Sequence, residues 1–134
     1  MRAARTYQSI DRHTAVMAGN PIDLVILLYE RLLQHLMTAS QSMEKNDIAA
    51  RGLAIGKAIE IIEKGLIGCL DMQQGGDLAV RLKFQYEFWM HQLLRVNMNA
   101  DPELLKSVDL QVKDILSSWR ELKTIGPQLA VRSG

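Results

Sequence analysis

The sequence has little of several residue types on which common protein functions depend. Cys69 is the single cysteine among 134 residues, which excludes an intramolecular disulfide framework and fits a reducing compartment. The formal net charge is only +1, so the bulk charge indicates neither nucleic acid nor an acidic membrane surface as a partner. The longest apolar run, Leu24 to Tyr29, is far shorter than the roughly 20 residues that cross a bilayer. No apolar stretch follows Arg2 and Arg5 to make a secretory signal, so we expect a cytoplasmic protein without membrane insertion.

Proline is also scarce, and its positions mark helix boundaries. It occurs only at positions 21, 102 and 127, and no segment reads as a strand. Apolar residues instead recur at spacings of three and four, as in amphipathic helices. We expect four helices, over residues 21–43, 47–71, 77–98 and 102–123. Because the connectors are short, sequential helices become antiparallel neighbours. The sequence therefore predicts an all-α fold, an antiparallel up-down four-helix bundle in a single domain.

Short polar residues stand at the expected helix starts. Asn20 and Asp101 each precede a proline, while Asp47 and Asp77 open the second and third helices. A side-chain oxygen at such a position accepts one of the backbone N–H groups that have no partner inside the helix. The largest side chains expected in the core are Tyr29, Tyr86, Trp89 and Trp119, and the core stripe of the second helix begins at Ile48.

Two terminal segments fall outside the predicted bundle. Residues 1–18 form a separate N-terminal cap segment, in which a short helix around Tyr7 to Val16 is one interpretation. Gly126-Pro127 is typical of a helix end, so residues 128–134 are expected to be a loose tail.

The candidate chemical groups do not assemble into a recognisable site. His13, His35 and His91 lie on different segments, and no repeated pair of acid and histidine provides the ligands of a metal-binding bundle. Cys69 has no base at helical spacing to activate it, and Gly75-Gly76 lacks the lysine and spacing of a phosphate loop. We therefore predict no catalytic, cofactor-binding or metal-binding residues, and no enzyme.

More apolar residues are present than one predicted core needs. Ile26 and Leu33 fall beside the core stripe of the first helix, and Phe84 and Phe88 lie one turn apart on the polar face of the third. Spare apolar surface in a chain without evident chemistry indicates that it binds another chain. Packing of the two phenylalanines against the N-terminal segment, or against a second copy of the chain, is the alternative.

The second helix carries a face of small residues. Ala54 and Ala58 lie on this face, where Ile61 is the large residue. One interpretation is a shallow trough into which the backbone of a partner settles. The other is close packing against a neighbouring helix of the bundle.

The order and spacing of many residues resemble one known family. The matching positions, between residues 7 and 122, are Tyr7-Gln8, Pro21, Leu24, Leu28-Tyr29, Asp47, Ala58, Ile61-Ile62, Leu66, Leu70-Asp71, Gly75 to Ala79, Leu82, Tyr86, Met90, Leu93, Asn97, Asp101 and Trp119. On these residues the chain resembles the flagellar secretion chaperones, the FliS family. It departs from that pattern in Gly19-Asn20 before the proline, in the bulk of Phe88-Trp89 and in its glycine-rich second helix.

The resemblance implies a cytosolic export chaperone. Such a protein binds the disordered C-terminal region of flagellin, prevents premature polymerisation and supports delivery to the flagellar type III secretion apparatus. It also implies that the N-terminal segment, with Tyr7, Gln8 and Ile10, is a movable cap over part of the binding surface. Flagellar export-gate or regulatory proteins, and a homodimer, remain open as further partners. The alternative function is a regulatory four-helix module, such as a histidine phosphotransfer domain or another adaptor for helical peptides.

Overall fold

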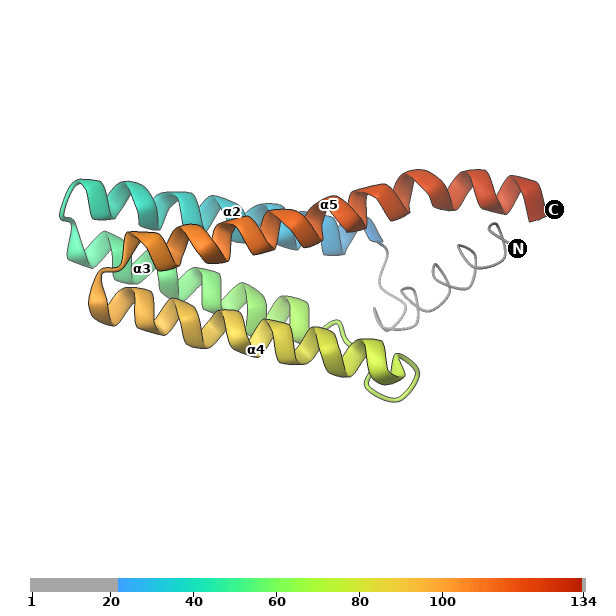
Figure 1. Ribbon diagram of the computed structural model, residues 1–134, viewed down its shortest axis with the longest axis horizontal. Helices are drawn as coiled ribbons and strands as arrows, with labels where there is room; N and C mark the ends of the chain where they lie inside the picture. Colours follow the sequence, from blue (N-terminus) through green and yellow to red (C-terminus); the bar gives the residue numbers. More distant parts are fainter. Residues whose placement is uncertain (1–21, 134) are drawn as a thin grey trace.

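The structure, a computed structural model, describes residues 22–133, and the side chains of residues 22–125. Its elements are α2 (Ile22–Glu44), α3 (Ile48–Glu60), the π-helix η1 (Ile61–Ile67), α4 (Gly76–Asn99) and α5 (Pro102–Ser133). Figure 1 shows an elongated bundle in which the chain reverses direction at each connector. The described residues contain helices and no strand, which confirms the predicted all-α bundle. The predicted N-terminal cap, with Tyr7, Gln8 and Ile10, lies outside the described residues.

Two of the helix starts are stabilised by aspartate side chains. The Oδ1 atom of Asp47 accepts the backbone N–H of Ala50 at 3.0 Å, and that of Asp101 accepts the N–H of Leu104 at 3.1 Å. α4 has no side-chain cap, since its N-cap residue is Gly75, and the Asp71 carboxylate instead accepts the N–H groups of Gln73 and Gln74 in the turn before the helix. The expected cap at Asp77 is therefore wrong, because the helix begins one residue earlier, and Asp77 lies in its first turn.

The second predicted helix, residues 47–71, is divided in two. The α-helix ends at Glu60 and a π-helix continues to Ile67. A π-helix has wider turns, so the 3.6-residue period of the sequence does not reveal it. Gly65 lies in this segment against α2, where an added Cβ atom would stand 3.0 Å from the Leu28 Cδ2 atom. Ile48, expected in the core, is exposed because the first turn of α3 lies at the end of the bundle (Figure 1).

The last helix is longer than predicted. It passes through Gly126-Pro127 and ends at Ser133, so the helix over 102–123 and the loose tail over 128–134 are both corrected. Figure 1 shows this extension of α5 beyond the other helices. A helix already nucleated over many residues adds further turns at little cost. Leucine and alanine, which follow at positions 129 and 130, favour helix and offset part of the penalty at glycine and proline.

The neighbours of each helix define the bundle. α2 packs against α3 and η1 on one side and against α5 on the other, while α4 packs against α3, η1 and α5. The ion pairs Glu30–Arg120 and Asp23–Lys123 also join α2 to α5. These pairs are largely exposed to solvent, so each contributes at most about 1 kcal/mol. Burial of apolar surface between the helices therefore dominates the stability.

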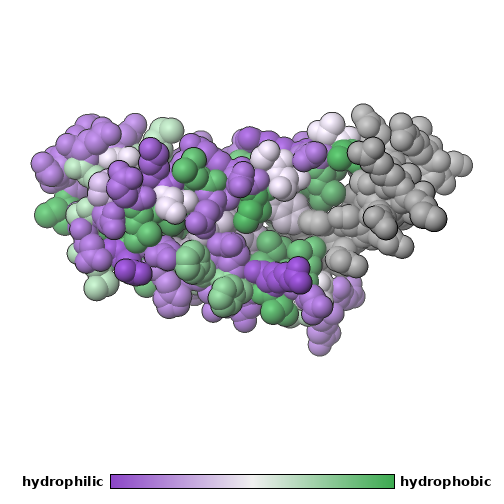
Figure 2. Space-filling model, in the orientation of Figure 1, coloured by the Kyte–Doolittle hydropathy of each residue, from purple (hydrophilic) through white to green (hydrophobic). Residues whose placement is uncertain are grey.

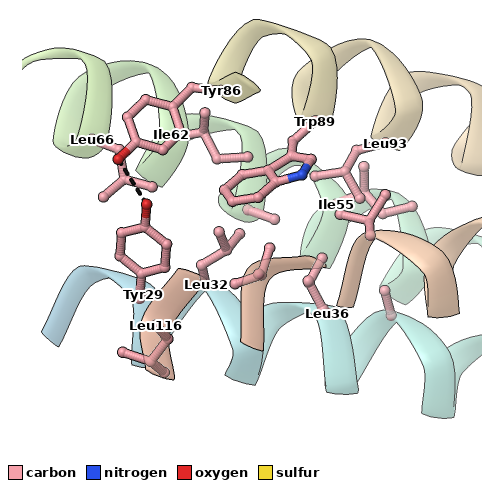
Figure 3. Packing of buried hydrophobic residues seen from close by; sticks show 14 of the residues in the cluster. Tyr29, Leu32, Leu36, Ile55, Ile62, Leu66, Tyr86, Trp89, Leu93 and Leu116 are labelled. Carbon is pink, nitrogen blue, oxygen red and sulfur yellow. Dashed lines mark hydrogen bonds between the residues drawn. The ribbon is translucent and has the colours of Figure 1, made fainter. Parts of the chain in front are cut away.

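Aromatic side chains occupy the centre of the core, as predicted. Tyr29 from α2 and Tyr86 from α4 point toward one another, and their hydroxyl oxygens are 2.7 Å apart in a buried hydrogen bond (Figure 3). Trp89 and Trp119 contact the Tyr29 ring, and the Trp89 Nε1–H group donates to Gln111 Oε1 at 3.0 Å. Burial raises the pKa of Tyr29 to about 12, so this phenol stays neutral at physiological pH.

Candidate partner-binding surfaces

Exposed large apolar side chains gather along α4. Five of them share the side of the helix that points away from the core, and we call them the α4 stripe: Val80, Phe84, Phe88, Leu94 and Met98. Successive members are four or six residues apart, and from first to last the stripe spans roughly 27 Å of helix at 1.5 Å per residue. Figure 2 shows hydrophobic side chains interspersed with hydrophilic ones on the face that includes α4.

The predicted pair Phe84 and Phe88 forms the centre of this stripe. The side chain of Phe84 is 75% exposed and that of Phe88 is 40% exposed. Solvent-exposed charges of both signs surround them, from Lys83 and Arg95 as well as Glu87. A row of exposed apolar side chains interspersed with charges of both signs is suited to an amphipathic protein segment, which carries apolar and charged side chains of its own.

The two residues of the first helix that were predicted to bind a partner, Ile26 and Leu33, are less exposed than the α4 stripe. Ile26 is 8% exposed and belongs to the core, and Leu33 is partly buried against it. The reason is that α2 has helices packed on two sides, which bury a wider face than one stripe requires. The expectation of an open apolar surface at Ile26 is therefore wrong.

The small-residue face of α3 is also covered. Ala54 is 3% exposed and Ala58 is fully buried, because both lie in the core of the bundle. The expectation of an open trough is therefore wrong, and the bundle itself fills this space, as in the second interpretation of the sequence. Ile61 is only partly buried and remains accessible at the edge of a groove.

This groove, which we call the α2–η1 groove, was not foreseen. It has a volume of about 430 Å³ and lies between α2 on one side and α3 with η1 on the other. Its lining residues are Leu28, Arg31, His35, Lys57, Glu60, Ile61, Lys64 and Gly65. In the sequence, the groove could have been suspected only from basic residues that recur at helical spacing on α2 and again on α3 with η1. Only the tertiary structure shows that these two segments face one another.

A small apolar cavity lies beside Cys69. Its volume is about 10 Å³, and Tyr86 and Trp119 are among its lining residues. This volume is at the lower limit for one water molecule, and an apolar lining gives a water few partners. Burial raises the pKa of the Cys69 thiol, which disfavours the reactive thiolate. The cysteine is therefore a packing residue.

Between residues 22 and 133, no three histidine, cysteine, aspartate or glutamate side chains lie close enough to hold a metal ion. None of the helices in this range combines the length and apolar character that crossing a membrane requires.

A four-helix bundle that has an exposed apolar stripe and also an open groove elsewhere on its surface is typical of proteins that bind other polypeptides. The comparison with known families specifies this class further, because the family model described as "Flagellar protein FliS" matches residues 3–125. The chain belongs to the FliS family.

Curated relatives support this assignment over nearly the full length. The flagellar secretion chaperone FliSB of Pseudomonas aeruginosa is 36% identical over 119 residues, which cover 89% of this chain and 94% of the relative. The flagellar secretion chaperone FliS of Salmonella typhimurium is 30% identical over 118 residues, covering 88% and 87%. That of Escherichia coli is 30% identical over 120 residues, covering 90% and 88%. These names denote chaperones, a non-enzymatic role, and a chaperone of the export system implies a client protein as partner. The resemblance seen in the sequence is confirmed.

Proposed function

We propose that this protein is a cytosolic export chaperone for flagellin. It binds the disordered C-terminal region of flagellin, prevents premature polymerisation and supports delivery to the flagellar type III secretion apparatus. Membership of the FliS family supports the general role. The single structural observation that carries the proposal is the α4 stripe, a row of five exposed apolar side chains on one side of α4 that the bundle does not cover.

The α4 stripe supplies the free energy that such a client needs. A disordered segment loses conformational entropy when it becomes ordered, so it must bury substantial apolar surface to bind. Burial of one fully exposed large apolar side chain contributes about 1.5–3 kcal/mol, and the five side chains of the stripe, which are 40–80% exposed, can each contribute a corresponding part of that. An amphipathic client helix of roughly 18 residues would match its length of about 27 Å.

The N-terminal residues belong to the same proposal. A movable cap with Tyr7, Gln8 and Ile10 would shield apolar surface while no client is bound, and a client would displace it. Export-gate or regulatory proteins, and a second copy of the chain, are further partners that could use a surface of this kind.

The test is calorimetric titration with the C-terminal segment of flagellin and with flagellin truncated before it. We expect binding of the segment at one-to-one stoichiometry, a negative heat-capacity change and no binding of the truncated protein. The Phe84→Ala/Phe88→Ala variant should bind at least about tenfold more weakly, a loss of about 1.4 kcal/mol.

Leu110→Ala is the matched control, because Leu110 is an exposed apolar residue on α5, outside the α4 stripe. Its affinity should stay within about twofold of the unmodified protein, which is a difference of less than about 0.5 kcal/mol. Equal binding of truncated and complete flagellin would contradict the proposed client segment. Unchanged affinity of the double phenylalanine variant would contradict the role of the α4 stripe.

A further inference from the structure

The α2–η1 groove combines an apolar floor with a charged rim. Leu28 from α2, and Ile61 and Gly65 from η1, are partly buried and form its apolar part. Gly65 has no side chain, which lets the Leu28 side chain pack directly against its backbone. The residues that line it on α3 and η1 extend from Lys57 to Gly65, roughly 12 Å of helix, or about two turns.

The rim of the groove is positively charged. Arg31, Lys57 and Lys64 are permanent cations, whereas Glu60 is the one acidic residue in its lining. Glu60 is already paired with Lys64 at 3.4 Å, which leaves Arg31 and Lys57 on the facing helices with no acidic partner in the lining. Three cations against one anion give the groove an excess of two positive charges, while the whole chain carries a net charge of only +1.

The lowered pKa of His35 agrees with this positive environment. Its side chain lines the groove together with Arg31 on its own helix and Lys57 on α3. Burial, and then the charges of Lys57 and Arg31, lower the pKa of His35. The two cations therefore act together on one point of the groove, where an anionic group would be attracted.

We infer that the α2–η1 groove is a docking site for an acidic amphipathic helix from a partner protein. The apolar side chains of that helix would lie on Leu28, Ile61 and Gly65, and its glutamate or aspartate side chains would reach Arg31 and Lys57. A groove between two helices is the usual receptor for an amphipathic helix. This inference does not rest on the proposed function, since the groove and the α4 stripe are formed by different residues.

Other occupants fit the groove less well. An extended peptide adds to the edge of a sheet, and the described residues include no strand. Proline-rich segments and single-stranded nucleic acids are bound by aromatic side chains, and none of the lining residues is a phenylalanine, tyrosine or tryptophan. Charge attraction alone would suit any polyanion, but the apolar floor requires a ligand with an apolar face as well.

The test uses a fluorescein-labelled synthetic peptide of about 18 residues, with leucine and alanine on one helical face and glutamate on the other. Two reference peptides are a version with lysine in place of glutamate and a scrambled acidic version without an apolar face. Fluorescence anisotropy with the complete protein should show that the first peptide binds at least about tenfold more tightly than either reference. Its affinity should also fall when the NaCl concentration is raised from about 50 to about 500 mM.

Charge reversal locates the binding site. Arg31→Glu and Lys57→Glu should each weaken binding of the acidic peptide at least about tenfold, since each replaces an attraction by a repulsion. Lys106→Glu is the matched control: it makes the same charge change on an exposed lysine of α5, on the other side of α2. The control should bind within about twofold of the unmodified protein once the uniform effect of net charge is screened by salt. Circular dichroism should show equal helix content in all three variants.

Several results would overturn the inference. One is absence of binding by the acidic amphipathic peptide, and another is equal binding by the lysine peptide or the scrambled peptide. Equal loss in Lys106→Glu and Lys57→Glu would show that only net charge matters. Tighter binding of single-stranded RNA, or of vesicles of anionic lipid, than of the acidic peptide would assign the groove to a nucleic acid or to a membrane surface instead.

Discussion

α2 and α4 are helices of 23 and 24 residues that use apolar side chains in opposite ways. α2 has the densest apolar run of the chain, yet Val25, Ile26 and Tyr29 within it are buried. α4 has a more polar sequence, yet it presents the five exposed side chains of the α4 stripe. Both helices contact α3, η1 and α5, but α2 packs against them much more extensively than α4 does, which explains the difference. An apolar run is therefore a poor guide to exposed apolar surface where the neighbouring helices pack closely, whereas phenylalanines on a polar face are a good one.

The largest expected effect on stability is the difference between truncating a buried side chain of α2 and truncating an exposed side chain of α4. Leu32→Ala in α2 should lower the free energy of unfolding by about 2–5 kcal/mol, because it leaves a cavity in a fully buried site. Phe84→Ala in α4 should change it by less than about 0.5 kcal/mol, because that side chain is mostly in solvent. Urea denaturation followed by circular dichroism measures both. Similar losses for the two variants would remove the contrast between the helices.

A second prediction concerns the hydrogen bond that joins the two helices in the core. Tyr29→Phe should lower the free energy of unfolding by about 1–3 kcal/mol, because it leaves the buried Tyr86 hydroxyl without this partner. Adding Tyr86→Phe should cost less than the sum of the single changes, since the Tyr86 hydroxyl is then no longer left buried without its partner. A double-mutant cycle in urea gives the coupling. Strict additivity of the two changes would show that the hydroxyl pair contributes no net stability.

The smallest predicted effect lies where the two helices end. Asn46 after α2 and Ala100 after α4 both have left-handed backbone conformations, with φ of 55° and 49°. Asparagine adopts this conformation readily and alanine adopts it only at a cost in free energy, so Ala100→Gly should raise the free energy of unfolding by about 0.5–1 kcal/mol. Asn46→Gly should change it by only a few tenths of a kcal/mol, because its relief of strain is smaller. Thermal unfolding of both variants provides the measurement, and destabilisation by Ala100→Gly would contradict the argument.

Much of the fold follows from local patterns in the sequence. Asp47 and Asp101 identify helix starts because a cap acts within three residues of its own position. Tyr29, Tyr86 and Trp89 are correctly placed in the core because apolar periodicity reports the buried face of a helix. Gly126-Pro127 misled the prediction, since these residues weaken a helix without necessarily ending it.

Part of the candidate site also follows from the sequence. The exposure of Phe84 and Phe88 is predictable because their position opposite the core stripe is a property of a single helix. Val80, Leu94 and Met98, which extend the pair into a stripe, were missed, although the same helical spacing relates them. Ala58 and Ile26 were misplaced because a face of small or apolar residues suits a partner and a neighbouring helix equally well.

The sequence by itself determined the helical class, the caps at Asp47 and Asp101, most of the core and the family, because each depends on residue types close together in the chain or on their order. Only the tertiary structure decided which apolar faces are covered and which helices face one another. In the tertiary structure the small-residue face of α3 is buried, and the α4 stripe is exposed. The tertiary structure also brought Arg31 and Lys57 to one groove beside a π-helix. The physical reason is that burial and electrostatic fields depend on distances between segments far apart in the sequence, which no local pattern specifies.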